Sequence, residues 1–290
     1  MGTYRIITDS TADLTPEMVE ELELYVISLC YQLEGKTYRN IPGGVEQSEP
    51  DFYNRLRAGN MSTTSQVNSE EFLAEFEPFL KRGEDVLYIA FSSGLSGTCQ
   101  SAMIAKKELA EKYPERRVEV FDSLSASMGE GLLVYHAAML KKSGAGLDEV
   151  LAWLKENVLN LCHWFTVDDL NHLKRGGRVS TATALVGTML GIKPILHVDD
   201  EGHLIPMSKV RGRKQSLDAL AKKMEETGIN PSEQTVFISH GDCLEDARYV
   251  EQEIKARLGV KKVSLNYIGP VIGAHSGPGT VALFFLGTKR

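Results

Sequence analysis

Short apolar runs alternate with longer amphipathic stretches along the first half of the chain. The apolar runs are rich in β-branched and aromatic residues, which predicts strands at 4–8, 25–33, 86–91 and 117–122. Apolar residues at helical spacing between these runs predict helices at 17–23, 49–58, 69–81, 99–113, 125–142 and 147–157. This alternation favours a mostly parallel sheet covered by helices.

The same rhythm restarts at about residue 160. Strands are predicted at 162–167, 192–198, 204–210, 235–239, 263–267 and 280–286, and helices at 168–174, 179–189, 214–227 and 244–258. Asp199-Asp200-Glu201-Gly202 separates two of these strands and is typical of a β-hairpin turn. The sequence therefore predicts two α/β domains with mostly parallel sheets, at residues 1–158 and 159–290.

Four polar loops lie where predicted strands end, which is where open α/β sheets bind ligands. They are Asp9–Asp13, Ser62–Asn68, Ser92–Thr98 and Gly273–Gly279. Hydroxyls and backbone amides in such loops donate hydrogen bonds to a carboxylate or phosphate. Plainer interpretations are a capped turn at 9–13, a polar surface loop at 62–68 and a structural role for His275.

The loop at 92–98 lacks the motifs of common nucleotide-binding and hydrolase turns. No Gly-Lys-Ser/Thr follows its glycines, so it is not a Walker A motif. Its glycine spacing does not fit a GxSxG elbow either. We interpret the loop as an anion cradle without evident activation of a nucleophile.

Composition narrows the class of protein. The net charge of −7 argues against a nucleic-acid-binding protein. The four cysteines form no CxxC pair, which excludes a zinc ligand pattern and suggests free thiols in a reducing compartment. We find no signal peptide and no apolar run near the roughly 20 residues that a membrane span needs. We therefore expect a cytoplasmic protein without stable membrane insertion or a bound metal.

Two basic clusters interrupt this acidic chain. One contains Arg175 and Arg178 on either side of two glycines, and the other contains Arg211. Such clusters can form a docking surface for an anionic partner. The alternative for the first cluster is a solvated turn with a glycine helix cap.

Several motifs together resemble the DegV family, whose members are bacterial proteins that bind a single fatty acid. They occur in family order at 7–14, 64–66, 92–98, 173–178, 193–196 and 240–242 and in the loop with His275. Val67-Asn68 departs from the Pro-Ser that the family usually has after Thr-Ser-Gln. The resemblance implies two α/β domains, with the fatty acid carboxylate near the interdomain cleft.

The resemblance also implies which residues bind the ligand. Thr64 and Ser93 would be the principal carboxylate contacts, and His275 would approach from the second domain. Lesser candidates are Ser65, Ser96, Gly97 and Gly277. The acyl chain needs an apolar tunnel, for which Val186, Met189, Leu190, Ile192 and Ile195 are candidates that fit an ordinary core equally well.

Some family members present their fatty acid to a separate kinase, which converts the carboxyl group to an acyl-phosphate. The resemblance then implies a long-chain fatty acid as ligand, a fatty acid kinase as partner, and no cofactor or independent catalysis. Arg175, Arg178 and Arg211 would face the partner or its phosphate. Two alternatives remain open: a phosphorylated-metabolite binding protein, and a serine-dependent acyl hydrolase or transferase that uses Ser93 with His275.

Overall fold

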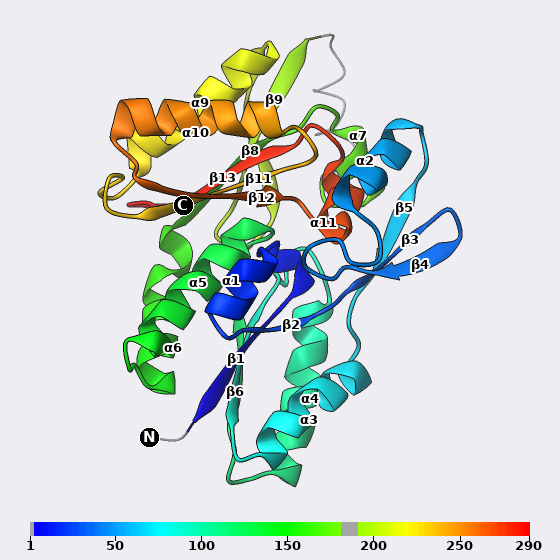
Figure 1. The fold of residues 1–290 in the computed structure, drawn as a ribbon, viewed down its shortest axis with the longest axis vertical. Helices are drawn as coiled ribbons and strands as arrows, with labels where there is room; N and C mark the ends of the chain where they lie inside the picture. Colours follow the sequence, from blue (N-terminus) through cyan, green and yellow to red (C-terminus); the bar gives the residue numbers. More distant parts are fainter. Residues whose placement is uncertain (1–2, 181–190) are drawn as a thin grey trace.

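The computed structural model describes residues 3–180 and 191–290. Its N-terminal half contains a parallel sheet with the strand order β2-β1-β6-β7 (Figure 1). These strands are β1 (Tyr4–Asp9), β2 (Tyr25–Ile27), β6 (Asp85–Ala90) and β7 (Val118–Asp122). Neighbouring residues Ile6 and Ile7 enter two different buried clusters, because both faces of this sheet are covered.

The C-terminal half contains a mixed sheet with the order β10-β9-β8-β13-β11-β12. Its strands are β8 (Leu161–Thr166), β9 (Ile192–Val198), β10 (Leu204–Arg211), β11 (Thr235–His240), β12 (Lys262–Tyr267) and β13 (Val281–Leu286). The predicted α/β class is confirmed. The expectation of mostly parallel strands is wrong for this sheet, where β11 and β12 form the one parallel pair among the described strands. The short β9–β10 turn enforces antiparallel pairing, whereas α10 (Leu244–Leu258) supplies the crossover that a parallel pair requires.

A third, small antiparallel sheet was not predicted. It consists of β3 (Cys30–Leu33), β4 (Lys36–Arg39) and β5 (Ser62–Ser65). The single strand predicted at 25–33 is therefore interrupted at 28–29. The predicted polar loop at 62–68 begins as a strand, in which Thr64 pairs with Tyr31 of β3.

Helices cover both large sheets. Within the described residues, the remaining helices are α1 (Pro16–Glu21), α2 (Glu49–Arg57), α3 (Ser69–Lys81), α4 (Thr98–Lys112), α5 (Met128–Lys142), α6 (Leu147–Asn157), α7 (Asn171–Arg175), α9 (Arg213–Thr227) and α11 (Pro270–Ser276). Two short 3₁₀ helices are η1 (Ser10–Ala12) and η2 (Val158–Asn160). Most of the predicted loop at 273–279 is thus the end of α11. Of the predicted helix at 179–189, residues 181–189 lie outside the described residues, as do Val186, Met189 and Leu190.

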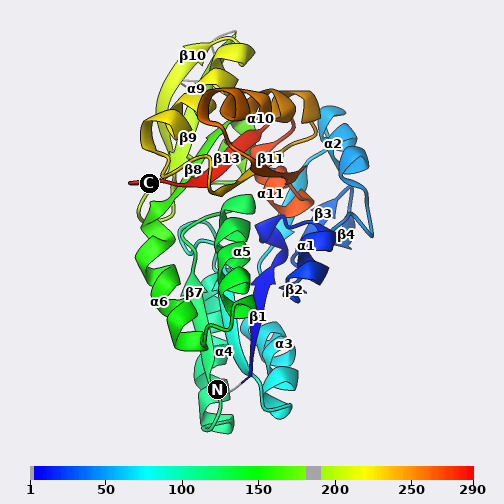
Figure 2. The same ribbon diagram turned by 60° about the vertical axis from the view of Figure 1, so that its left-hand side comes forward.

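Helix α5 joins the two large sheets into one core (Figure 2). It packs against β1 and β6 on one side and against β8, β11 and β13 on the other. One buried cluster accordingly contains Ile6, Leu132 and Phe284. The boundary proposed at residue 158 falls in η2, between α6 and β8, and the division into two domains stays a prediction. No helix within the described ranges combines the length and apolarity that crossing a membrane requires.

Candidate functional site

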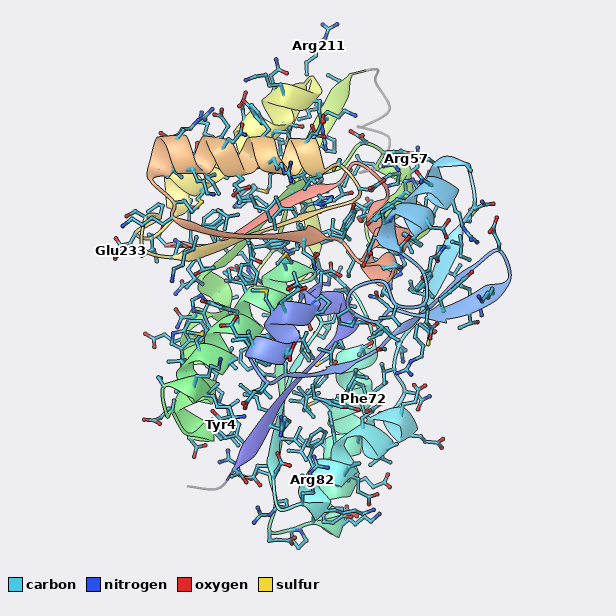
Figure 3. All side chains as sticks on the ribbon, viewed as in Figure 1. Tyr4, Arg57, Phe72, Arg82, Arg211 and Glu233 are labelled. Carbon is cyan, nitrogen blue, oxygen red and sulfur yellow. The ribbon has the colours of Figure 1, made fainter. Side chains whose placement is uncertain are left out.

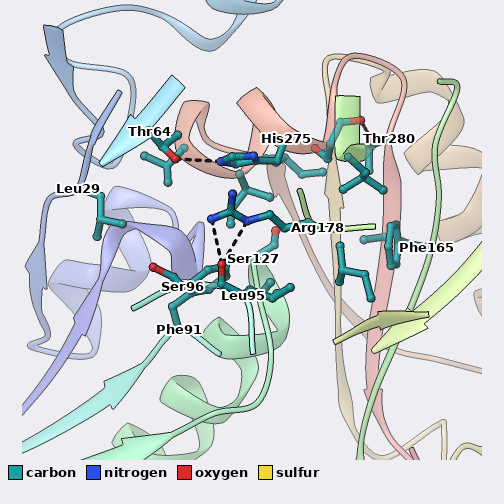
Figure 4. A pocket seen from close by; sticks show the side chains of 18 of the residues that line it. Leu29, Thr64, Phe91, Leu95, Ser96, Ser127, Phe165, Arg178, His275 and Thr280 are labelled. Carbon is teal, nitrogen blue, oxygen red and sulfur yellow. Dashed lines mark hydrogen bonds between the residues drawn. The ribbon is translucent and has the colours of Figure 1, made fainter. Parts of the chain in front are cut away.

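A cavity of about 420 Å³ lies where the small sheet, the loop after β6, α11 and the C-terminal sheet meet (Figure 4). One part of its wall is polar and includes Thr64, Ser65, Gln66, Ser96, Arg178 and His275. Another part is apolar and includes Leu29, Phe91, Phe165, Leu204, Val271 and Ala282. The cavity therefore suits a ligand that has both a polar and an apolar part.

Thr64 and His275 form the central polar contact, with 2.8 Å between Thr64 Oγ1 and His275 Nε2. Pairing of β5 with β3 fixes Thr64, and α11 carries His275. Burial, followed by the positive charge of Arg178, lowers the pKa of His275 to about 4. The imidazole is therefore neutral at pH 7.

The surroundings of His275 assign its tautomer. Its Nδ1 is buried and has no hydrogen-bond partner among the described residues. A proton on Nδ1 would be a buried donor without an acceptor, so we place the proton on Nε2, which then donates to Thr64 Oγ1. A Cβ on Gly176 would overlap the imidazole at Nδ1, which explains a glycine at this position. The Thr64 hydroxyl proton is left to donate to a ligand.

The loop after β6 brings Ser96 to the cavity and leaves Ser93 outside it. Of the described residues that line the cavity, Ser96 and Gly97 are members and Ser93 is not. In this turn the Ser93 backbone N–H donates to Asp122 Oδ1 at the end of β7. Ser96 thus lies in the cavity wall, whereas the resemblance implied Ser93 as a principal contact, and the serine that binds a ligand stays a prediction.

Three further predicted residues lie in different surroundings. Gly277 caps α11 and faces His172, so it lies outside the described lining of the cavity. Arg211 is exposed on β10 and projects from the outer end of the molecule (Figure 3). Arg175 is exposed and contacts His172, with 3.0 Å between Arg175 Nη2 and His172 Nδ1.

Arg178 is partly buried and lies in the cavity wall. Its Nε and Nη2 both donate to the Leu95 carbonyl, at 3.1 and 3.0 Å, and Nη1 donates to the Gly176 carbonyl. Burial lowers the pKa of its guanidinium. Arg178 therefore supports the loop that carries Ser96 and places a cation near His275.

A second depression of about 260 Å³ adjoins the cavity. The two share Thr64, Arg178 and His275, and the depression is also lined by Met61 and Arg175. The Thr64–His275 pair thus stands between the apolar cavity and a polar, basic depression. A ligand head group held by this pair would be approachable from the depression.

Three carboxyl groups are buried close to the cavity: Asp9 and Asp13 of the predicted polar loop, and Glu130, which the sequence did not indicate. Thr8 Oγ1 lies 2.7 Å from Glu130 Oε1 and 3.1 Å from the Ile89 carbonyl oxygen. One hydroxyl carries one proton, so both contacts are hydrogen bonds only when Glu130 is protonated and donates to Thr8. Burial raises the pKa of Glu130 and that of Asp9, which caps η1 by accepting from the Thr11 backbone N–H.

Asp13 connects this acidic group to the cavity. Its Oδ2 accepts from Ser127 Oγ at 2.5 Å, and its Oδ1 accepts from the Gly269 backbone N–H at 2.9 Å. Burial raises the pKa of Asp13 to about 8. Ser127 lines the cavity in a strained conformation with φ of 54° and ψ of −148°. Within the described ranges, no group of three or more histidine, cysteine or acidic residues could hold a metal ion.

Comparison with known proteins agrees with this architecture. The DegV family, described as "Uncharacterised protein, DegV family", matches residues 3–288. A DegV domain-containing protein of Clostridium perfringens is 48% identical over 100% of this chain and 99% of its own.

Two solved structures are similar over almost their whole length. "Fatty Acid Binding of a DegV family Protein from Thermus thermophilus" has a TM-score of 0.87 and 31% identity, covering 99% of this chain and 100% of that one. "DegV, a fatty acid binding protein from Bacillus subtilis" has a TM-score of 0.84 and 30% identity, with the same coverage. Sequence and fold lead to one conclusion: this chain belongs to the DegV family.

Proposed function

We propose that this protein binds one long-chain fatty acid and presents its carboxyl group to a separate kinase. The observation that carries the proposal is the 420 Å³ cavity, which combines a cluster of hydroxyl and imidazole donors with apolar walls. The fatty-acid-binding relatives of Thermus thermophilus and Bacillus subtilis support it.

The polar wall suits a carboxylate. A buried carboxylate needs several donors to offset its lost hydration. The Thr64 hydroxyl is available because His275 donates to its oxygen. Ser96 supplies a second hydroxyl, which can donate to a ligand when its oxygen accepts from the Thr98 backbone N–H and hydroxyl. The guanidinium of Arg178 adds a positive charge in the same wall. The apolar wall would receive the acyl chain, with a gain of about 0.8 kcal/mol for each buried methylene group.

The geometry favours this ligand-binding role over a serine hydrolase. A hydrolase of that kind needs its serine within hydrogen-bond reach of a histidine. His275 Nε2 contacts Thr64, and Ser93 lies outside the described lining of the cavity.

Titration with hexadecanoic acid tests the binding role. We expect Thr64→Val and Ser96→Ala each to weaken binding by about tenfold or more, because each removes a hydrogen bond to a charged group. Ser93→Ala is the matched control from the same loop and should change the affinity by less than about twofold. Calorimetry of delipidated protein measures all three.

If Ser93→Ala weakens binding and Ser96→Ala does not, Ser93 contacts the carboxylate, as the family resemblance implied. If the wild-type protein does not bind hexadecanoic acid and instead copurifies with a phosphorylated metabolite, the metabolite-binding alternative is supported.

Presentation to a kinase draws support from the adjoining depression. It shares Thr64 and His275 with the cavity, so a phosphate donor could approach the bound carboxyl group from this side. Arg175 lines the depression and is exposed, and Arg211 offers a second exposed cation. The kinase would hold the nucleotide, and this protein would hold the acyl chain.

Charge reversal tests the partner surface. We expect Arg175→Glu and Arg211→Glu to slow acyl-phosphate formation by on the order of tenfold when the protein, ATP and the organism's fatty acid kinase are combined. Their affinity for hexadecanoic acid should stay the same, because neither side chain lines the described cavity wall. If both variants form acyl-phosphate at the wild-type rate, these arginines do not contribute to binding of the kinase.

A further inference from the structure

The turn between β9 and β10 reaches across to the loop that carries Ser96. Ser92 Oγ donates to the Gly202 carbonyl at 2.9 Å. Asp199 shapes the turn, because its side chain accepts from the backbone N–H groups of Glu201 and His203 at 3.0 and 2.8 Å. A preformed turn of the C-terminal sheet thus contacts a loop of the N-terminal sheet.

The contact is close enough to require glycine on both sides. A Cβ on Gly202 would overlap Ser92 Oγ and lie 3.2 Å from the Leu124 Cα. From the opposite side, a Cβ on Gly94 would lie 2.8 Å from the Glu201 carbonyl oxygen. Gly202 is buried between two exposed neighbours, Glu201 and His203. The two backbones therefore fit together with no space for a side chain.

Ser92 links the β9–β10 turn to the loop that lines the cavity. Its hydroxyl accepts from the Gly94 backbone N–H at 3.2 Å, and its carbonyl accepts from the Ser96 backbone N–H at 3.2 Å. Two residues beyond Gly202, Leu204 lines the apolar part of the cavity. The same turn thus borders the acyl-chain wall and holds the loop with the head-group hydroxyl.

We propose that the β9–β10 turn, through Gly202, is the positioning element that sets the preference of the cavity for a carboxylate head group. This inference rests on the proposed fatty acid binding. Gly202 touches no ligand. It fixes Ser92, which fixes the backbone of Ser96, so that the Ser96 hydroxyl meets one oxygen of the ligand. Displacing the turn would misplace this donor and leave the apolar walls in place.

Comparing an acid with the matching alcohol tests the proposal. Hexadecanoic acid and hexadecan-1-ol share the acyl chain and differ at the head group. We expect the wild type to prefer the acid, and Gly202→Ala to bind the acid about tenfold more weakly while its affinity for the alcohol changes by less than about twofold.

Gly35→Ala is the matched control, because it carries the same backbone strain without the contact. Gly35 has φ of +75°, close to the +80° of Gly202, and no atom of the described residues lies within 4 Å of a Cβ placed there. This variant should keep the acid preference of the wild type. Ser92→Ala removes the bridging hydroxyl without backbone strain, and should reduce the acid preference even if Gly202→Ala does not fold.

Each other outcome has a distinct meaning. Equal losses for acid and alcohol in both Gly202→Ala and Ser92→Ala would show a merely structural role and overturn the inference. An acid preference retained in both variants would overturn it as well. A wild-type protein that binds neither ligand would instead overturn the proposed function on which the inference rests.

Discussion

Replacing Ala282 by phenylalanine is expected to weaken binding of hexadecanoic acid by on the order of 100-fold. Ala282 lies on β13 and pairs with Phe165 of β8, and both line the cavity. A phenyl ring at this position would occupy space for about three to four methylene groups. At about 0.8 kcal/mol for each methylene, the loss is about 3 kcal/mol.

The loss should depend on chain length, which separates it from a general defect. Decanoic acid needs less of the cavity, so its affinity should fall far less than that of hexadecanoic acid. Mass spectrometry of organic extracts gives a second measurement, in which the variant should retain shorter acids than the wild type. Equal weakening for both acids would contradict the placement of the acyl chain against β13.

The sequence predicts the strand that carries Ala282, but not which face of this strand lines the cavity. The strand at 280–286 was predicted almost to its ends. Its alternation was not visible, because both faces are buried: Val281 and Leu283 pack under α9 and α10, while Ala282 and Phe284 face α5 and the cavity. The face that lines the cavity depends on how the two large sheets are arranged, and a local sequence pattern does not contain this information.

For the polar wall, the sequence likewise predicts the segments that carry the hydroxyls but not how single residues are placed. The hydroxyl clusters around Thr64 and Ser96 were recognised, because several donors in a short loop are a local feature. That Thr64 belongs to a strand was missed, since Ser-Thr-Thr-Ser lacks the apolar alternation of a half-buried strand. Ser96 and Ser93 are three positions apart in one loop, and the sequence alone does not indicate that Ser96 lines the cavity while Ser93 is not among the described lining residues.

The buried carboxyl groups were hidden for a different reason. Glu130 falls in the first turn of α5, where an acidic residue is expected on the helix surface. Its burial depends on Thr8 and Thr11 of a segment more than a hundred residues away. Partners so distant in sequence leave no pattern along the chain, so neither Glu130 nor Ser127 could be singled out.

The free energy of unfolding is expected to lose part of its pH dependence when Asp13 is replaced by asparagine. Asp13 is buried, and desolvation raises its pKa to about 8 in the folded protein, whereas an unfolded aspartate has a pKa of about 3.9. Below pH 4 the carboxyl group is protonated in both states, and its stabilising contribution is fully present.

Between about pH 4 and pH 8 the unfolded chain is ionised at Asp13 while the folded protein keeps the proton. Each pH unit in this window then lowers the stability by about 1.4 kcal/mol for this one group. Above pH 8 both states are ionised, and the contribution no longer changes. The stability that Asp13 provides is therefore lost as the pH rises.

Asparagine suits this position in shape and hydrogen bonding. Residue 13 has φ of 50° and ψ of 33°, a left-handed conformation that asparagine adopts readily. The amide oxygen can accept from the Gly269 N–H, and the amide nitrogen can donate to Ser127 Oγ, which lies 2.9 Å from Ser239 Oγ. The carboxamide keeps these contacts without titrating.

Urea unfolding from pH 5 to pH 8 measures the difference between Asp13→Asn and the wild type. We expect the variant to gain about 1.4 kcal/mol relative to the wild type for each pH unit. Asp51→Asn is the control, because the hydrogen bond from Gln47 lowers the pKa of Asp51 and places its titration below this window. A constant difference for Asp13→Asn would mean that Asp13 is already ionised at pH 5, so that Ser127 donates to a carboxylate beside the cavity.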